Sequence, residues 1–599
     1  MFYRSLTENP ARLRRALPVL ALAGVSFAIG AIVAGNRSDS PGQKLASQFV
    51  AAWARSDYAS MYSDVDAASR RTTTPSEFAT AYQHALVTAT ATGMRVTGRA
   101  RNLPEGIVAV PVLVRTRLFG ALALSFMLKL APDAGEGDRI AWSPSAVFPG
   151  LLAGERLSRT TALPRRATLL ARDGSVLAEG STSGVVGEQA RSSPLGEVAS
   201  AVLGNVGPVP ASRRAALEAQ GVPADAAVGV SGLELALDDR LRGIPGGQLL
   251  ASDPQAPGPA RVLASAAPRP APPLRSSLSP TVQRAAVSAL GGQLGGIVAM
   301  QPSTGRILGV AGIGLGGLQP PGSTFKMVTL SGVLEAGIAN PQTSFPYATY
   351  ATLDGVHLNN ANGENCGGTL ELAFAVSCNA VFTPLGVKLG ASRLVSAAER
   401  FGFNRPVGLT GAAESTLPAA SSIQGELEVG STAIGQGQVI ATPLQMATVA
   451  VTIADGGRRP APTFDQTAPP APAARAIRAD VARTVRRLMI GVVRGGTGTS
   501  AAIPGVTVAG KTGTAELKSQ SELKSQCSSP EAGAHEESAP EECGASQASN
   551  TDAWFAAFAP ALHPRIAVCV LLVKDGAGGE TAAPVARQVI EAGLQAGAH

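Results

Sequence analysis

The stretch PPGSTFKMVTLSGVLEAG, residues 320–337, places a serine and a lysine three positions apart at the start of an apolar segment. If a helix begins near Ser323, Lys326 lies one turn further along on the same face. Ser323 then occupies a helix N-terminus, where free backbone N–H groups and the helix dipole favour negative charge. A serine there, beside an amine in a low dielectric, can be a nucleophile. Taken alone, the tetrad fits an ordinary N-cap serine and a solvated lysine better.

Two further motifs follow in the chain. Ser377-Cys378-Asn379 comes after the serine-lysine tetrad, and Lys511-Thr512-Gly513-Thr514 comes later still. Each has a plain structural alternative, since Ser377 and Asn379 can cap helices and KTGT can be an exposed strand end. Together and in this order they resemble the S-x-x-K, S-D-N and K-T-G set of penicillin-binding proteins and serine β-lactamases.

The three motifs contain what acyl transfer from an amide needs: a nucleophile, a proton shuttle and an oxyanion site. We expect Ser323 to attack and Lys326 to accept its proton, with burial and neighbouring positive charge lowering the lysine pKa. Ser377 can relay a proton to the leaving amine. Asn379 can hold Lys326 and the substrate amide.

The KTGT motif is expected on an edge strand. Lys511 with Thr512 or Thr514 can then bind a substrate carboxylate, and Gly513 removes a side chain where substrate lies against the strand. The backbone N–H groups of Ser323 and Thr514 would form the oxyanion hole.

The composition of the chain bounds the number of domains and argues against some classes of ligand. At 599 residues the chain predicts roughly four domains of about 150 residues. Its net charge of +7 comes without long basic runs and with only 4% aromatic residues, so no nucleic-acid partner is expected. The five histidines are scattered, so no metal site and no cofactor are expected. They are His84, His357, His535, His563 and His599.

The beginning of the chain predicts a membrane anchor. Four arginines, at positions 4, 12, 14 and 15, lie before ALPVLALAGVSFAIGAIVAG, residues 16–35, which carries no charge. An apolar run of this length can span a bilayer, and the arginines predict that residues 1–15 stay in the cytoplasm. A cleaved signal peptide is the competing interpretation, although its apolar core is usually about 7–15 residues. The remaining chain is expected outside the cell membrane.

Four segments follow this run. Residues 40–150 combine amphipathic helices with strands, and residues 152–265 contain a strand-turn-strand signal around Asp173-Gly174. The proline-rich residues 251–275 are typical of a linker. From about residue 275 to 599, two strands, many helices, three strands and a last helix indicate one sheet assembled from both ends. Residues 516–550 form a polar insert in which ELKSQ occurs twice, typical of a surface loop.

Further stretches resemble the class B penicillin-binding proteins, which are monofunctional peptidoglycan D,D-transpeptidases. The similarity extends over nearly the whole chain. Residues 40–150 are similar, through FVAAWARSDYASMY, to the NTF2-like domain of a resistance-associated subgroup. The other matching stretches are GVSGLELALDDRLRGIPG (229–246), PTVQRAAVSAL (280–290), GQGQVIATPLQMA (435–447), RGGTGTSAAIPGVTVAGKTGTAE (494–516) and DAWFAAFAP (552–560).

The resemblance implies a multidomain α+β protein. Its expected parts are a single transmembrane helix, an NTF2-like domain (40–150), a dimerisation domain (152–265) and a transpeptidase domain (275–599) with a five-stranded antiparallel sheet between helices. Two departures are visible. The family usually opens its dimerisation domain with Arg-Gly, whereas this chain has Arg165-Arg166, and the insert after KTGTAE is longer than is typical of the family. The middle motif, S-C-N, is one that the family allows.

The implied activity is cross-linking of peptidoglycan stem peptides through a serine acyl-enzyme. Ser323 would attack the penultimate D-alanine carbonyl, and β-lactams would acylate the same serine. A partner glycosyltransferase and other elongation or division proteins are expected, with roles in cell shape, cell division and antibiotic resistance. The alternatives are a D,D-carboxypeptidase, a β-lactamase, a β-lactam sensor and a division scaffold with little turnover. A sensor would need a cytoplasmic signalling region, and the segment 1–15 before the span is short for one.

Cysteine positions predict one disulfide and suggest a second. Outside the membrane thiols meet an oxidising environment, and Cys366 lies shortly before Cys378 in a turn that can fold back. Cys527 and Cys543 form the second candidate pair. Cys569 alternates with apolar residues and is expected to be buried and unpaired. Two buried free thiols at Cys366 and Cys378 are the alternative.

Overall fold

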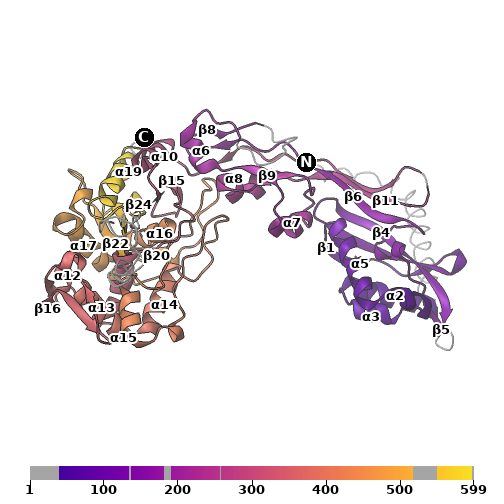
Figure 1. Ribbon diagram of the computed structural model, residues 1–599. Coiled ribbons are helices and arrows are strands. Elements are labelled where there is room, and N and C mark those ends of the chain that lie inside the picture. Colours follow the sequence, from indigo (N-terminus) through magenta and orange to yellow (C-terminus); the bar gives the residue numbers. More distant parts are fainter. Residues whose placement is uncertain (1–38, 134–136, 181–190, 257, 517–549, 597–599) are drawn as a thin grey trace, which may run out of the picture. The chain divides into compact units, whose positions relative to one another are not determined.

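The computed structural model describes residues 39–133, 137–180, 191–256, 258–516 and 550–596 (Figure 1). The chain divides into two compact units. Unit 1 comprises the described residues up to 163 together with 211–224 and 244–269, and unit 2 comprises 164–210, 225–243 and the chain from 270. Residues 152–265 therefore contribute to both units, because this part of the chain alternates between them.

The predicted anchor at 16–35 and nearly all of the polar insert at 516–550 lie outside the described residues. Across the ranges that the structure does describe, no helix combines the length and the apolar character needed to cross a bilayer.

Unit 1 packs short helices against a twisted antiparallel sheet. Its two longest helices, α2 (Pro41–Ala54) and α5 (Pro75–Thr88), each begin with a capping box and a proline in the first turn. Strand order is β1-β3-β4-β5, with β2 beside β3. The other elements are α3 (Tyr58–Ser63), α4 (Ala67–Thr72), β1 (Ala91–Val96), β2 (Arg101–Asn102), β3 (Ile107–Thr116), β4 (Gly120–Asp133), β5 (Gly137–Ile140) and α7 (Ala211–Glu218).

The core of unit 1 is aromatic. Trp53 of α2 packs edge-on against Phe126 of β4, with ring centroids 4.7 Å apart. Strand β3 buries every second residue, so one of its faces lies against the helices. A chain with only 4% aromatic residues thus concentrates several of them here, where large rings bury much area per residue.

The predicted linker at 251–275 is wrong for its central part. Residues 261–266 form strand β12 (Arg261–Ala266), which pairs with β11 (Gly246–Ser252), and β11 pairs in turn with β6 (Arg156–Ala162). All prolines of this segment lie before Arg261 or after Ala266, so the ladder N–H groups of β12 are intact. The high proline content of residues 251–275 therefore comes from the flanks of the strand, and the strand itself contains no proline.

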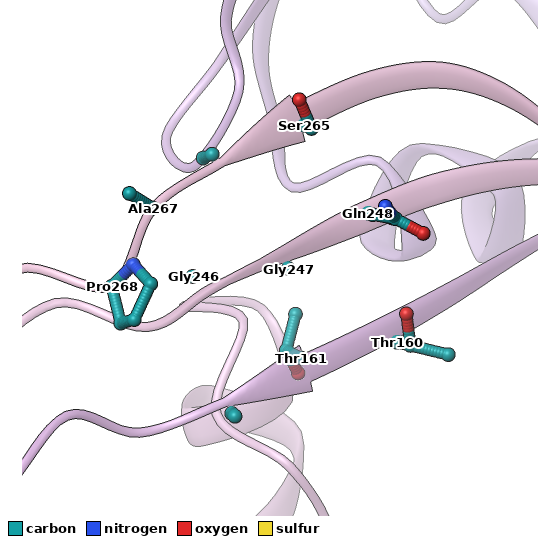
Figure 2. Close-up of a pocket in the computed structure, with 10 residues that line it drawn as sticks. Thr160, Thr161, Gly246, Gly247, Gln248, Ser265, Ala267 and Pro268 are labelled. Atoms are coloured by element: carbon teal, nitrogen blue, oxygen red, sulfur yellow. The ribbon is translucent and has the colours of Figure 1, made fainter.

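A shallow pocket of about 470 Å³ lies at one end of this three-stranded sheet. Figure 2 shows Thr160 and Thr161 on β6, Gly247 and Gln248 on β11, and Ser265 on β12 around it. Its lining carries no charged side chain and none of the residues predicted to be functional.

Unit 2 contains a five-stranded antiparallel sheet in the order β15-β14-β24-β23-β22. The prediction of one sheet assembled from both ends of this segment is confirmed. Among the described residues, strand β22 forms an edge, since it pairs only with β23. The strands are β14 (Gly295–Met300), β15 (Ile307–Gly312), β22 (Ala509–Glu516), β23 (Thr551–Ala559) and β24 (Ile566–Leu572).

Helices cover both faces of this sheet. On one face α10 (Pro280–Leu290) and α19 (Ala582–Ala596) lie beside each other (Figure 1). On the other face α16 (Pro443–Ala454) is buried at every position, because it lies between the sheet and further helices. Those helices are α11 (Lys326–Glu335), α12 (Leu370–Ala375), α13 (Asn379–Leu389), α14 (Ala391–Phe401), α15 (Gly425–Ala433) and α17 (Ala479–Gly495).

Smaller elements complete unit 2. Strands β7, β8 and β13 form one small sheet, while β16 with β19, β17 with β18 and β20 with β21 form separate pairs. Their bounds are β7 (Leu169–Leu170), β8 (Val176–Ala178), α6 (Glu197–Leu203), β9 (Val206–Pro208), β10 (Ala227–Gly229), α8 (Gly232–Ala236), α9 (Asp238–Leu241), β13 (Leu274–Arg275), β16 (Ser344–Ala348), β17 (Tyr350–Leu353), β18 (Val356–Asn359), β19 (Cys366–Thr369), β20 (Arg458–Arg459) and β21 (Ala474–Arg475).

A buried ion cluster holds segments 164–210 and 225–243 of unit 2 together. Arg166 bonds Glu234 at 2.7 Å and Asp238 at 2.8 Å, and Arg191 bonds the other oxygen of Glu234 at 2.8 Å. Burial raises the pKa of the Asp238 carboxyl, but Arg166, the Gly229 N–H and Arg242 outweigh it and hold that pKa below its usual value. The second arginine of the unusual Arg165-Arg166 pair is therefore a core residue, fixed by the GVSGLELALDDR stretch.

Replacing Glu234 by glutamine should destabilise unit 2 by about 3–5 kcal/mol, because two buried guanidinium groups lose their shared counter-charge. The control is Glu591→Gln, whose partner Arg587 is exposed, and it should cost about 0–1 kcal/mol. Urea unfolding of both variants measures the difference. Equal, small changes in the two would show that the cluster contributes little.

Candidate active site

The turn that carries Ser323 differs from the prediction at its start. A 3-10 helix spans Gly322–Phe325, and the α-helix begins only at Lys326. Side chains at positions i and i+3 eclipse in a 3-10 helix, so Ser323 and Lys326 still lie on one side. Ser323 is partly exposed, whereas Lys326 has no exposed surface. The turn therefore combines a partly exposed serine with a fully buried lysine on one side.

Two glycines allow this turn to touch strand β22. Gly322 has a φ of +50°, and a Cβ there would lie 2.8 Å from the carbonyl oxygen of Thr514. A Cβ on Gly513 would lie 2.8 Å from the Pro321 oxygen and 2.9 Å from the Trp554 Cβ. We expected Gly513 to leave room for substrate. Instead, the space beside its Cα is filled by the protein itself.

The same contact orients Thr514. Its carbonyl faces Gly322, on the side of β22 that has no neighbouring strand. In an antiparallel ladder both backbone groups of one residue point to the same side. The N–H of Thr514 is thus directed toward the turn that carries Ser323.

Two lysines converge on Ser377. Lys511 Nζ donates to Ser377 Oγ at 2.8 Å, and Lys326 Nζ donates to the same oxygen at 3.3 Å. Lys326 Nζ also donates to the Ser377 carbonyl and to Asn379 Oδ1, both at 2.6 Å. The structure thus brings four predicted residues from all three motifs into one hydrogen-bonded group. In the described chain the Ser323 hydroxyl makes no hydrogen bond of its own.

Both amines have lowered pKa values. Burial, reinforced by the charge of Lys511, holds the pKa of Lys326 well below its ordinary value. Burial lowers the pKa of Lys511 to about 7. Aromatic rings lie near both, with Phe382 5.6 Å from Lys326 Nζ and Phe374 5.6 Å from Lys511 Nζ. Lys511 can therefore exchange a proton near neutral pH, and Lys326 loses its proton more readily than an ordinary lysine.

Ser377 has an unusual backbone conformation. It lies between α12 and α13 with a φ of +60°, in the left-handed region. The N–H of Ser377 bonds the Phe374 carbonyl at 3.2 Å, and the N–H of Cys378 bonds the Ala373 carbonyl at 2.8 Å. These two bonds form a Schellman motif whose left-handed position is normally glycine. A serine here carries a strain of about 1–3 kcal/mol, which the surrounding contacts must offset.

Asn360 belongs to none of the predicted motifs, yet it supports the Ser377 turn. Its Oδ1 accepts from the Ala380 N–H at 2.9 Å and so caps α13 from a distance. The N-cap residue itself, Cys378, makes no such bond. The Asn360 amide nitrogen bonds the carbonyls of Ala348 and Glu364 at 2.8 and 2.7 Å. No periodic pattern points to it, and only the asparagine-rich NNANGEN stretch gives a weak turn signal.

Asn379 is held by the adjacent backbone. Its amide nitrogen donates to the Asn359 carbonyl at 2.7 Å, which turns its Oδ1 toward Lys326. The end of hairpin β17–β18 thereby fixes which atom of the amide meets the amine.

The threonines of KTGT have different surroundings. Thr512 Oγ1 lies 2.6 Å from the hydroxyl of Thr497 and 3.5 Å from Lys511 Nζ. Thr514 Oγ1 accepts from the Gly578 N–H at 3.4 Å. Thr497, in the loop before β22, is a second residue outside the three predicted motifs.

Cys366 and Cys378 are joined by a disulfide. Cys366 lies in β19, so the bridge ties the Ser377 turn to the pair β16–β19. Cys569 is a buried free thiol in β24, and burial raises its pKa. Cys527 and Cys543 lie outside the described residues.

Three family models match the chain. Residues 295–591 match the penicillin binding protein transpeptidase domain, residues 183–263 the penicillin-binding protein dimerisation domain, and residues 41–155 the NTF2-like N-terminal transpeptidase domain.

Individual proteins agree with these matches. The chain is 32% identical over 387 residues to the peptidoglycan D,D-transpeptidase PbpA of Mycolicibacterium smegmatis, covering 54% of this chain and 72% of the relative. It is 34% identical over 389 residues to PbpA of Mycobacterium tuberculosis, covering 53% and 72%. The solved ceftriaxone acyl-enzyme complex of penicillin-binding protein A from M. tuberculosis is similar with a TM-score of 0.53 and 27% identity, covering 72% of this chain and 99% of that one.

Removing the disulfide by the double substitution Cys366→Ala and Cys378→Ala should lower stability by about 3 kcal/mol, because the unfolded chain regains the entropy of a short loop. Thermal unfolding of the variant and the parent measures this. Reducing agent should then cause no further shift in the variant. A parent protein whose Cys378 is alkylated without reduction would contradict the prediction.

Proposed function

The chain belongs to the penicillin-binding proteins, peptidoglycan D,D-transpeptidases that β-lactams acylate, and we propose that Ser323 carries the acyl group. The observation that supports this most directly is the Ser377 hydroxyl bonded by the amines of Lys326 and Lys511 beside the Ser323 turn. A proton relay of this kind serves a nucleophile that is accessible, and Ser323 is the partly exposed member of the S-x-x-K motif.

Lys326 is suited to accept the Ser323 proton. A neutral amine has two N–H bonds and one lone pair. The Ser377 carbonyl and Asn379 Oδ1, each 2.6 Å from Nζ, can take the two N–H bonds, and the neutral amine then gives up the longer donation to Ser377 Oγ at 3.3 Å. The lone pair is then left for the Ser323 proton, and the lowered pKa keeps a neutral fraction available.

In the acylation step Ser323 Oγ bonds the penultimate D-alanine carbonyl carbon while its proton passes to Lys326. The N–H groups of Ser323 and Thr514 stabilise the negative oxygen that forms. The C–N bond then breaks, and the leaving D-alanine amine takes a proton through the Ser377 hydroxyl, which is replenished by a lysine. The products are an ester on Ser323 and free D-alanine.

In the second step the amine of a neighbouring stem peptide attacks the ester carbonyl. Its proton returns along the same relay, the C–O bond to Ser323 breaks, and a new peptide bond joins the two stems. Lys511, Thr512 and Thr514 bind the carboxylate of the donor peptide before the first step. The charged Lys511 and the hydroxyl donors on one strand supply the matching chemistry.

The expected domain boundaries stay proposals: residues 40–150 NTF2-like, 152–265 dimerisation, and 275–599 transpeptidase. Residues 16–35 are proposed as a single-pass anchor with residues 1–15 in the cytoplasm, on the strength of an uncharged apolar run behind four arginines. Fractionation of cells that express residues 1–599 or 39–599 tests the anchor, and only the longer chain should sediment with membranes. A partner glycosyltransferase and roles in elongation, division and β-lactam resistance are proposed from the family resemblance.

Ser323→Ala should abolish covalent labelling by fluorescent penicillin without loss of fold, because no other serine of the described chain combines this turn with Lys326 and Ser377. Gel fluorescence after denaturation measures labelling, and thermal unfolding checks the fold. The control is Ser331→Ala on α11, the helix that follows the Ser323 turn, and this variant should still label. Stoichiometric labelling of Ser323→Ala would refute the assignment.

Acylation by benzylpenicillin should have a bell-shaped dependence on pH. The rate constant rises with pH as Lys326 loses its proton, because only the neutral amine accepts one. It falls above about pH 7 as Lys511 loses its charge and binds the carboxylate less well. Stopped-flow measurement with the methyl ester, which has no carboxylate, should lack the falling limb. The same falling limb for both compounds would remove Lys511 from carboxylate binding.

A further inference from the structure

Thr497 lies directly behind the third motif, in the loop between α17 and β22. Its hydroxyl oxygen is 2.6 Å from Thr512 Oγ1, and either atom can be the donor. Its own N–H bonds the Ala375 carbonyl at 3.1 Å. Nothing in the S-x-x-K, S-x-N and K-T-G pattern includes this residue.

The backbone around Thr497 leaves it little freedom. A Cβ on the preceding Gly496 would lie 2.2 Å from the Ala375 oxygen, and a Cβ on Gly579 would lie 2.1 Å from the Thr497 oxygen. The loop is thus clamped between the end of α12 and the segment after β24. A threonine held this closely presents its hydroxyl to Thr512 in a fixed position.

Donor and acceptor counting decides the direction of the bond. A threonine hydroxyl has one proton and two lone pairs. A carboxylate can only accept hydrogen bonds, so Thr512 must donate its single hydroxyl proton to the ligand. It then has to accept from its protein neighbours, and these are Lys511 Nζ at 3.5 Å and Thr497 Oγ1 at 2.6 Å.

The alternative acceptor for the Thr497 proton is poorer. The Ala375 carbonyl lies 3.5 Å from Thr497 Oγ1, at the outer limit of a hydrogen bond. That carbonyl already accepts the Thr497 N–H. Thr512 Oγ1 is therefore a better acceptor than the Ala375 carbonyl for the hydroxyl proton of Thr497.

We propose that Thr497 is a positioning residue of the carboxylate subsite, which donates to Thr512 and so turns the Thr512 proton toward the carboxylate of the acyl donor. This rests on the proposed function of Lys511 and Thr512. It deepens that function by making selectivity for carboxylate-terminated donors depend on a residue outside the three motifs.

The test compares two ligands on one site. Second-order acylation rate constants are measured for benzylpenicillin and its methyl ester with the parent, Thr497→Val and Thr497→Ser. The valine variant should lose about tenfold with the acid and keep its rate with the ester, since one hydrogen bond to a charged ligand weakens. The serine variant keeps the hydroxyl and should restore the parental ratio. If the valine variant does not fold, Thr497→Ala provides the same comparison.

A double-mutant cycle with Thr512→Val separates positioning from packing. If Thr497 acts through Thr512, adding Thr497→Val to Thr512→Val should cause no further loss with the acid. Equal losses with acid and ester, or fully additive losses, would overturn the proposal. Labelling of Ser323→Ala is independent of these results, so a failure of the proposed nucleophile and a failure of Thr497 remain distinguishable.

Discussion

The burial of two lysines around one serine hydroxyl is the constraint on which the active site depends. Lys326 and Lys511 have no exposed surface, and in the described chain neither makes a salt bridge. Two ammonium groups in such a place are costly, so the pKa values of both amines lie below that of an ordinary lysine. Polar and aromatic groups partly stabilise the two amines: the Ser377 carbonyl, the Asn379 amide and the rings of Phe382 and Phe374. None of these groups carries a full negative charge, whereas a carboxylate would neutralise the charge of an ammonium group.

The sheet order brings the two lysines together. Lys511 lies on β22, which is an edge strand among the described residues because β14, β24 and β23 take the inner positions. Lys326 begins the helix that follows the turn packed on that edge. Gly322 and Gly513 allow the contact, since a side chain at either would meet backbone or Trp554.

The sequence alone predicted the parts that are encoded in short continuous stretches. These are the three motifs, the strands and closing helix around them, and the pairing partner for Cys378. It did not predict the left-handed Ser377, because glycine is the usual signal for that conformation. Asn360 and Thr497 were missed for another reason. Their partners, Ala380 and Thr512, lie 20 and 15 residues away, and a single polar side chain leaves no periodicity. The strand at 261–266 was hidden by prolines that flank it.

The hydroxyl groups of Ser377 and Thr512 have similar hydrogen-bonding surroundings. Each has a single proton, and each lies beside another polar group: Lys511 Nζ donates to Ser377 Oγ at 2.8 Å, and Thr497 Oγ1, the proposed donor to Thr512, lies 2.6 Å from Thr512 Oγ1. An oxygen that accepts from the protein keeps its own proton for the substrate. In the proposed mechanism that proton serves the leaving amine at Ser377 and the carboxylate at Thr512. Reactivity and recognition at opposite ends of the terminal D-alanine would then depend on donors fixed behind two hydroxyls, and Lys511 Nζ contacts both.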